Sequence, residues 1–163
     1  MERATPDFTD EKTNAECLES FREYYLVHMQ DMTKPFKGVT ELILKLREKG
    51  VKTAVVSNKL HQAVYELCQD YFPGLIDEAI GVSDESERKP SPVNVYKAME
   101  KLGVCAEECI YIGDSDVDVQ TAHNAGLKCI SVTWGFRDRE ELFAAGAGII
   151  MDNCSDILNF FDD

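Results

Sequence analysis

The sequence predicts an α/β fold in which helices flank a mainly parallel sheet. Short apolar runs rich in β-branched residues alternate along the chain with amphipathic stretches of helical length, and this alternation is typical of βαβ units. Glycines follow several of the helical stretches, as at Gly50, Gly103 and Gly126, where helices commonly stop. With 163 residues, the chain is long enough for one domain with a sizeable core.

The predicted elements begin after a polar end over residues 1–12. Residues 13–32 carry apolar side chains at helical spacing, so we expect an amphipathic helix that belongs to no βαβ unit. A linker with Pro35 and Gly38 follows it. The remaining helices are expected at 39–49, 59–71, 91–102, 116–124, 138–145 and 155–161, and the strands at 51–56, 76–82, 109–112, 127–133 and 148–151.

The composition limits the classes of function. A net charge of −13 without an offsetting basic patch disfavours a nucleic-acid or anionic-membrane partner. No apolar run approaches the roughly 20 residues that a membrane span needs, and the N-terminus has no apolar signal segment. The six cysteines lack the spacing of a metal site, so we expect reduced structural thiols. We therefore expect a cytoplasmic protein.

The most informative segment is the apolar strand that ends at Gly113 and runs into three acids. Asp114, Asp116 and Asp118 fall within five residues. Ligands of open α/β sheets bind outside the carboxyl ends of the strands, which is where these acids are expected. Carboxylate oxygens suit Mg²⁺, which prefers one or two carboxylates together with water and a substrate phosphate. We expect Asp116 to point to solvent.

Two polar segments upstream extend this candidate site. Residues 57–59 (Ser-Asn-Lys) follow an apolar strand, and Lys89 precedes Pro90 in a charged loop. Taken alone, each segment has an ordinary explanation: a turn or helix cap, a solvated charge, or acids favoured at a helix N-terminus. Their order and their placement after strands favour a shared site. Trp134 is expected to anchor the core or a loop rather than to stack on a substrate.

These three segments resemble the second, third and fourth motifs of the haloacid dehalogenase superfamily. Residues 132–137, with the Ala-Gly-Ala of 145–147 downstream, are similar to its phosphoglycolate phosphatase-like members. The segment 35–42 resembles the junction between cap and core in the same members. The resemblance covers most of the chain. It implies a Rossmann-like core over 35–163. Residues 1–34 would then comprise a polar N-terminal end followed by the last helix of a helical cap.

The resemblance also implies a chemistry, the Mg²⁺-dependent hydrolysis of a small phosphate monoester through an aspartyl-phosphate. Lys89 and Ser57 would then be catalytic. The substrate phosphate of a small phosphorylated metabolite would be bound by Ser57, Asn58 and Lys89. The metal would be held by Asp114 and Asp118, of which Asp118 would either ligate Mg²⁺ directly or orient its water.

The first motif of the family has no match in this sequence. That motif is an apolar strand ending in Asp-x-Asp, whose first aspartate is the nucleophile, whereas the acids of residues 7–10 have the wrong spacing and no strand before them. In the family this strand is central in the sheet, between the strands that end here at Ser57 and Gly113. The chain thus resembles a C-terminal part of such a phosphatase, and we expect it to be inactive alone.

Unpaired strand edges invite pairing with another chain, so we expect the gap left by this strand to be filled. The two flanking strands could pair directly. Alternatively, residues 1–12 of this copy, a segment of a second copy in a homo-oligomer with strand exchange, or a companion polypeptide could add a strand.

Other functions remain open at this stage. The main alternative is a non-catalytic haloacid dehalogenase-like binding or interaction module. A phosphomutase would have the same motifs. A dehalogenase is disfavoured by the Asp114 and Asp118 pair, because that branch of the family is not metal-dependent. The cap supplies specificity in this family, so the motifs do not identify the substrate.

Overall fold

The computed structural model describes residue 6 and residues 9–161 of the chain, which divides into two compact units, Met1–Lys34 and Pro35–Asp163. The boundary falls in the linker that contains Pro35 and Gly38. The assignment of the first unit to a cap remains a prediction. No helix in the described part of the chain is long and apolar enough to cross a membrane.

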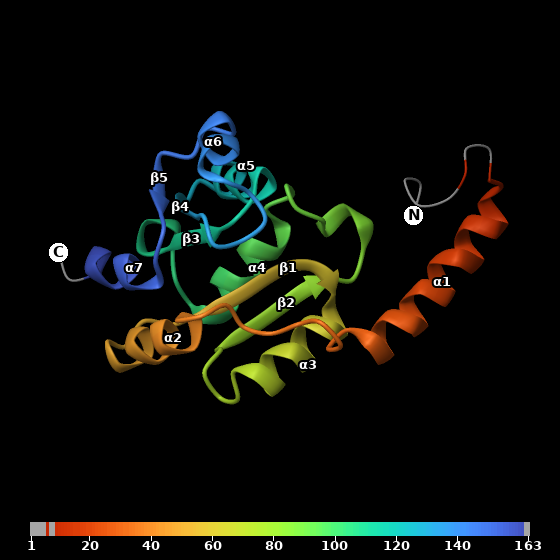
Figure 1. Cartoon of the computed structure of the whole chain (residues 1–163), viewed down its shortest axis with the longest axis horizontal. Helices are drawn as coiled ribbons and strands as arrows, with labels where there is room; N and C mark the ends of the chain where they lie inside the picture. Colours follow the sequence, from red (N-terminus) through yellow and green to blue (C-terminus); the bar gives the residue numbers. More distant parts are fainter. Residues whose placement is uncertain (1–5, 7–8, 162–163) are drawn as a thin grey trace. The chain divides into compact units, whose positions relative to one another are not determined.

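The first unit consists mainly of one helix, α1 (Glu11–His28) (Figure 1). Asp10 caps its start, where a carboxylate oxygen accepts the backbone N–H of Thr13 at 3.0 Å. The helix is shorter than predicted because the chain turns after His28, and the Thr33 hydroxyl donates to the Met29 carbonyl at 2.7 Å. No residue of α1 is buried, so its apolar positions do not form a core.

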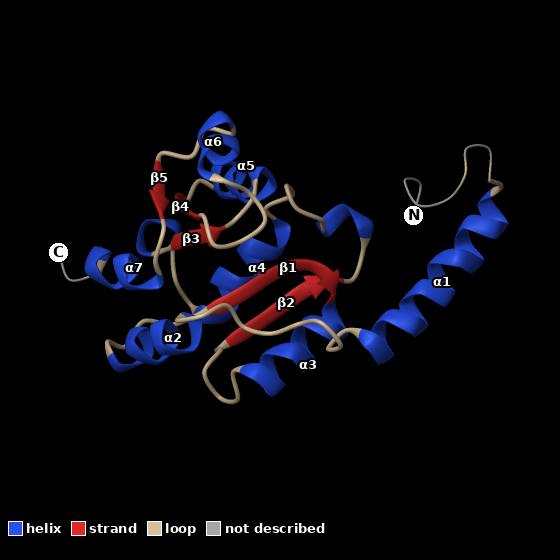
Figure 2. Cartoon of the chain, in the orientation of Figure 1, coloured by secondary structure: helices blue, strands red, loops and turns tan. Residues whose placement is uncertain are grey.

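The second unit alternates strands and helices in the predicted order (Figure 2). Its helices are α2 (Val39–Glu48), α3 (His61–Tyr71), α4 (Val93–Leu102), α5 (Asp116–Ala125), α6 (Arg139–Ala144) and α7 (Cys154–Phe160). Its strands are β1 (Ala54–Leu60), β2 (Glu78–Val82), β3 (Ile110–Gly113), β4 (Lys128–Val132) and β5 (Ile149–Met151). Two short 3₁₀ turns, Glu85–Glu87 and Ala106–Glu108, precede α4 and β3.

These strands form two parallel sheets, β1-β2 and β3-β4-β5 (Figure 2). The predicted α/β fold with parallel strands and flanking helices is therefore confirmed. Of the alternative ways to fill the gap, direct pairing of the strands at Ser57 and Gly113 is wrong, because β1 and β3 belong to different sheets. Within residues 1–12, positions 1–5 and 7–8 lie outside the described residues, and the described positions contain no strand.

The strands on either side of this division are less buried than their partners. Neither β1 nor β3 contains a fully buried residue, and the side chain of Ile112 in β3 is 39% exposed. By contrast, β2 and β4 contain the buried Ile80 and Ile130. In a parallel sheet that helices cover on both faces, strands are normally buried. The lower burial agrees with the strand order, in which β1 pairs only with β2 and β3 only with β4. Each of β1 and β3 therefore has one edge without a strand partner among the described residues.

The three-stranded sheet has two faces with different roles. One face packs on α2 and α7 through alternate strand positions. Its core consists of Leu42, Leu46, Ile130, Val132 and Ile157, with Ile110, Ile149 and Met151 against it. The other face packs on α5 and α6 through Val119 and Leu142, with Cys129 and Ile150 partly buried beside them. Strand alternation places Tyr111 and Gly113 on this second face, toward α5.

The predicted strand 51–56 is displaced, because β1 begins at Ala54 and continues to Leu60. Its pairing with β2 shifts register between Val56 and Leu60, and Leu60 then pairs with Val82. A Cβ on Gly81 would lie only 2.6 Å from the Lys59 carbonyl oxygen, so glycine permits the close approach of β1 there. Ser57 and Asn58 therefore lie within this irregular end of β1 rather than after the strand.

Candidate active site

The predicted site residues gather around the carboxyl ends of β1 and β3 in the second unit. Ser57 and Asn58 lie near the end of β1, Lys89 lies in the loop between β2 and α4, and Asp114 and Asp118 follow β3. Hydrogen bonds link four of these five residues in the order Asn58, Lys89, Asp118 and Asp114.

Asn58 fixes the backbone of Lys89. Its Oδ1 accepts the Lys89 backbone N–H at 2.7 Å, and its Nδ2 donates to the Lys89 carbonyl at 3.4 Å. The loop that carries Lys89 is therefore tied to the end of β1. The amide of Asn58 thus has a positioning role in this structure, and its contact with a substrate stays a prediction.

Ser57 is the site residue that these bonds do not reach. Its Oγ accepts the backbone N–H of Lys59 at 3.2 Å, which is a local turn contact. In the described part of the chain, no hydrogen bond connects it to Lys89 or Asp114. Because its hydroxyl can still donate, Ser57 keeps the hydrogen-bonding capacity that its predicted role requires.

Lys89 reaches across the division between the sheets to Asp118. Its Nζ lies 2.7 Å from Asp118 Oδ1, and the two side chains are only 15% and 7% exposed. Tyr111 joins this pair, since its hydroxyl donates to Asp118 Oδ1 at 3.0 Å and accepts from Lys89 Nζ at 3.2 Å. The ammonium of Lys89 thus occupies a fixed, largely buried position.

The spacing of Ser115 and Asp118 has a local structural reason. Ser115 is the N-cap of α5 and accepts the Asp118 backbone N–H at 3.3 Å, while its hydroxyl donates to Asp118 Oδ2 at 2.7 Å. This reciprocal arrangement resembles a capping box. Gly113 is required beside it, because a Cβ at that position would overlap the side chain of Asp118.

Asp118 is saturated with donors. Oδ1 accepts from Lys89 and Tyr111, and Oδ2 accepts from Ser115 Oγ and from the backbone N–H of Asp114 at 3.2 Å. An ionised carboxylate offers about four acceptor positions. Burial alone would raise the pKa of Asp118, but the charge of Lys89 and the hydrogen bonds outweigh it and hold that pKa below its usual value. Direct ligation of a metal by Asp118 would cost one of these bonds.

Asp114 has an available oxygen. Its Oδ2 accepts the backbone N–H of Phe136 at 2.9 Å, and Oδ1 receives no hydrogen bond from the described residues. The loop after β4 can approach this closely because residue 135 is glycine. Beside it, Asp116 is exposed as predicted, although it accepts from Arg137 Nε at 3.2 Å.

The available carboxylate oxygen of Asp114 fits a Mg²⁺ ion that is held by one carboxylate. The described residues contain no group of three or more histidine, cysteine or acidic side chains that could hold a metal. Mg²⁺ does not need such a group, because it is usually bound through one or two carboxylates plus waters and substrate phosphate. Asp114 Oδ1 is the oxygen that meets this requirement.

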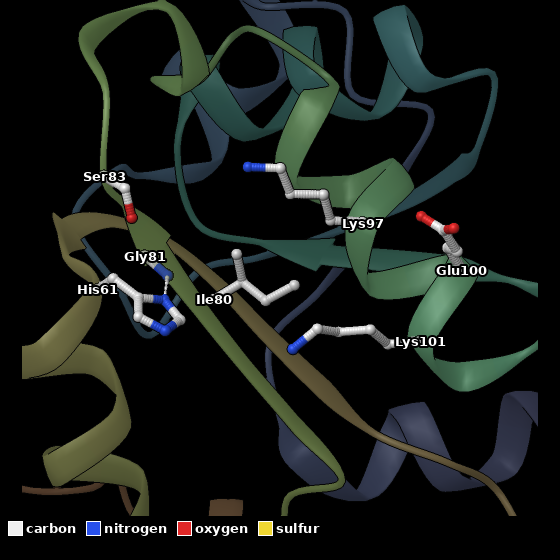
Figure 3. Close-up of a pocket in the computed structure, with 7 residues that line it drawn as sticks. All are labelled: His61, Ile80, Gly81, Ser83, Lys97, Glu100 and Lys101. Atoms are coloured by element: carbon white, nitrogen blue, oxygen red, sulfur yellow. Dashed lines mark hydrogen bonds between the residues drawn. The ribbon is translucent and has the colours of Figure 1, made fainter.

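Two hollows of the surface lie away from these residues. One cavity of about 180 Å³ lies between β2 and α4 and contains none of the predicted site residues (Figure 3). His61 Nδ1 accepts the backbone N–H of Gly81 there at 3.2 Å. Its lysines are already paired, Lys97 with Glu87 and Lys101 with Glu78. This cavity therefore offers positions for control variants rather than a competing site.

Sequence reasoning missed the site role of Tyr111 and the hydrogen bonds of Ser115 and Phe136. The Ser115 bonds were accessible, because Ser-x-x-Asp at a helix start predicts a cap. The position of Tyr111 on the α5 face follows from strand alternation. The contact of Phe136 depends on the path of a loop and had no sequence signal. Trp134 packs against the core cluster, as predicted.

Comparison with known proteins connects this geometry to a family. The family model described as haloacid dehalogenase-like hydrolase matches residues 1–132. A phosphoglycolate phosphatase from Aquifex aeolicus is 35% identical over 127 residues, which are 77% of this chain and 60% of that protein. The pyrophosphatase PpaX from Bacillus cereus strain AH820 is 28% identical over 155 residues, which are 94% of this chain and 72% of that protein.

A solved structure gives the same result. The crystal structure of a candidate phosphoglycolate phosphatase from Lactobacillus delbrueckii subsp. bulgaricus has a TM-score of 0.85 and 41% identity, covering 93% of this chain and 64% of that one. The chain thus spans less than two thirds of the length of the Aquifex and Lactobacillus relatives.

Proposed function

Since the chain belongs to the haloacid dehalogenase-like hydrolase family, we propose that its second unit binds the phosphoryl group of a small phosphate monoester beside Mg²⁺ and takes part in its hydrolysis. The observation that carries this proposal is the ion pair of Lys89 and Asp118 next to Asp114. It holds a cation beside a carboxylate with an available oxygen, and phosphoryl transfer needs positioning and neutralisation of charge above all.

Each residue then has a distinct role. Lys89 directs an N–H toward a phosphoryl oxygen and offsets its charge, which is worth most in a site largely shielded from water. Ser57 donates its hydroxyl to another phosphoryl oxygen. Asp114 holds Mg²⁺, which when bound would neutralise charge on the phosphoryl oxygens. Asp118 holds Lys89 in place.

We also propose that the nucleophile comes on a strand between β1 and β3. In the family, an aspartate on this strand attacks phosphorus, the bond to the leaving alcohol breaks, and water hydrolyses the aspartyl-phosphate. The edges of β1 and β3 that lack a partner among the described residues, together with the exposure of Ile112, support this position. Without this strand, the chain is expected to bind phosphate but not to turn over.

We propose that a segment outside the described residues supplies this strand, for example one from a companion polypeptide or a second copy. A non-catalytic binding module is the second candidate function, and the same open edges favour it. The two candidates differ in the effect of filling the gap, because a phosphatase gains turnover when the strand is present and a binding module does not.

The substrate class is inferred from the relatives. They include a phosphoglycolate phosphatase and a pyrophosphatase, so phosphoglycolate and pyrophosphate are the first compounds to compare. We propose a small phosphorylated metabolite of the monoester type.

The test is a turnover assay with and without a complementing strand. The chain is purified alone and together with a designed apolar segment ending in Asp-x-Asp, and phosphate release is measured with Mg²⁺. We expect turnover only with the segment, and loss of that turnover in Asp114→Asn. Absence of turnover with a segment that demonstrably binds would reject the phosphatase and leave the binding module.

A further inference from the structure

We infer that Tyr111 is a positioning residue that fixes the direction of the Lys89 ammonium toward a bound phosphate. This inference rests on the proposed function of Lys89. The supporting observation is a closed triangle of hydrogen bonds among three side chains. Lys89 to Asp118 measures 2.7 Å, Tyr111 to Asp118 3.0 Å and Lys89 to Tyr111 3.2 Å.

The position of Tyr111 is set by the sheet. Tyr111 pairs in register with Cys129 of the neighbouring strand β4, and its side chain projects toward α5. Because β3 is short and ends two residues later at Gly113, the hydroxyl lies close to the acids that follow the strand. The rigid strand therefore brings a phenol to the ion pair, whereas Lys89 itself comes from a loop.

The donors of Lys89 show what the phenol adds. A lysine ammonium has three N–H donors. One points to Asp118 Oδ1 and one to the hydroxyl of Tyr111, and the third has no acceptor among the described residues. With two donors fixed, rotation of the ammonium is restricted and the third N–H keeps one direction. We assign that third N–H to the phosphoryl oxygen.

Tyr111 can keep this arrangement because its hydroxyl remains a donor. It donates to Asp118 while accepting from Lys89, so both of its hydrogen-bonding functions are used. A phenol that donates in this way holds the ammonium in place without adding a charge of its own.

The first test compares Tyr111→Phe with Tyr96→Phe in the full chain. Tyr96 also loses a hydroxyl bond in this exchange, since it donates to the Asn124 carbonyl at 3.2 Å, but among the described residues no hydrogen bond joins its hydroxyl to Lys89, Tyr111 or Asp118. The probe is inorganic phosphate, measured by calorimetry. We expect Tyr111→Phe to weaken binding roughly three- to tenfold, the range of one net hydrogen bond, and Tyr96→Phe to leave it unchanged.

The second test observes Lys89 directly, so that a general loss of stability is not mistaken for loss of positioning. The ¹⁵N–¹H signal of its ammonium is recorded without phosphate. In the wild-type chain its protons should exchange with water more slowly than those of the exposed Lys128, and in Tyr111→Phe this protection should fall. If the variant does not fold, the wild-type comparison still decides, because equal exchange of Lys89 and Lys128 overturns the inference.

The outcomes separate this inference from the proposed function. If Lys89→Met/Asp118→Leu weakens phosphate binding while Tyr111→Phe changes neither binding nor exchange, the positioning role is wrong and the function of Lys89 stands. If this double variant leaves phosphate binding intact, the proposed function fails, and the inference about the phosphate fails with it.

Discussion

Gly135 lies directly against the carboxylate of Asp114, so that a Cβ on residue 135 would overlap Asp114 Oδ2. The next residue, Phe136, donates its backbone N–H to the same oxygen at 2.9 Å. The loop after β4 thus orients Asp114 and leaves its other oxygen available.

Gly135→Ala should therefore weaken Mg²⁺ binding, because the new methyl group displaces either the loop or Asp114. Calorimetric titration of Mg²⁺ in the presence of phosphate measures this effect. Gly148→Ala is the matched control, since a Cβ there meets nothing within 4 Å. Equal Mg²⁺ affinity in the two variants would show that the loop does not orient the metal ligand.

Lys89→Met should destabilise the fold strongly, because it leaves Asp118 buried without its cation. Removing one partner of a buried ion pair typically costs roughly 3–5 kcal/mol in free energy of unfolding. Lys97→Met breaks a more exposed pair and should cost much less. Urea unfolding compares the two. The double variant Lys89→Met/Asp118→Leu should recover part of the loss, and no recovery would contradict a cost due to unpaired charge.

The ion pair should also make stability sensitive to acid. The pKa of Asp118 is lowered in the folded chain, so its contribution is fully present above the unfolded-state value of about 3.9. The contribution is then lost as the pH falls through the folded-state pKa. Thermal unfolding without Mg²⁺, followed from neutral to acidic pH, should show a steeper loss in the wild-type chain than in Asp118→Asn. Parallel curves would mean that another group controls acid unfolding.

The open edges of β1 and β3 should exchange amide hydrogens quickly and should promote self-association. Ile112→Lys places a charge on the exposed apolar position of β3 and should reduce association in sedimentation experiments. Phe143→Lys, a similar change on the exposed surface of α6, is the control. If the two variants associate equally, the edges are not the contact.

Local patterns in the sequence predicted most of the fold. Helix starts and stops depend on neighbouring residues, so Gly103 and Gly126 marked the ends of α4 and α5 correctly. The end of β1 was placed wrongly, since its register shift depends on the close approach of Lys59 to Gly81, which are distant in sequence.

In the site, too, local features were predictable from the sequence and long-range contacts were not. The order of the polar segments after strands indicated which residues belong together. The long-range partners were not accessible, because the bonds between Asn58 and Lys89 and between Lys89 and Asp118 depend on how loops from separate strands meet. The family resemblance implied that Asp118 either ligates Mg²⁺ or orients its water, whereas its contacts in the structure favour the anchoring of Lys89.

The most direct test of the account is a calorimetric titration of inorganic phosphate, with and without Mg²⁺. Mg²⁺ should strengthen phosphate binding to the wild-type chain. Asp114→Asn should remove that gain and leave metal-free binding intact, and Lys89→Met/Asp118→Leu should weaken binding in both conditions by about tenfold or more, as expected for a lost bond to a charged group. Lys97→Met should match the wild type. Phosphate binding that is indifferent to both Asp114 and Lys89 would contradict the account.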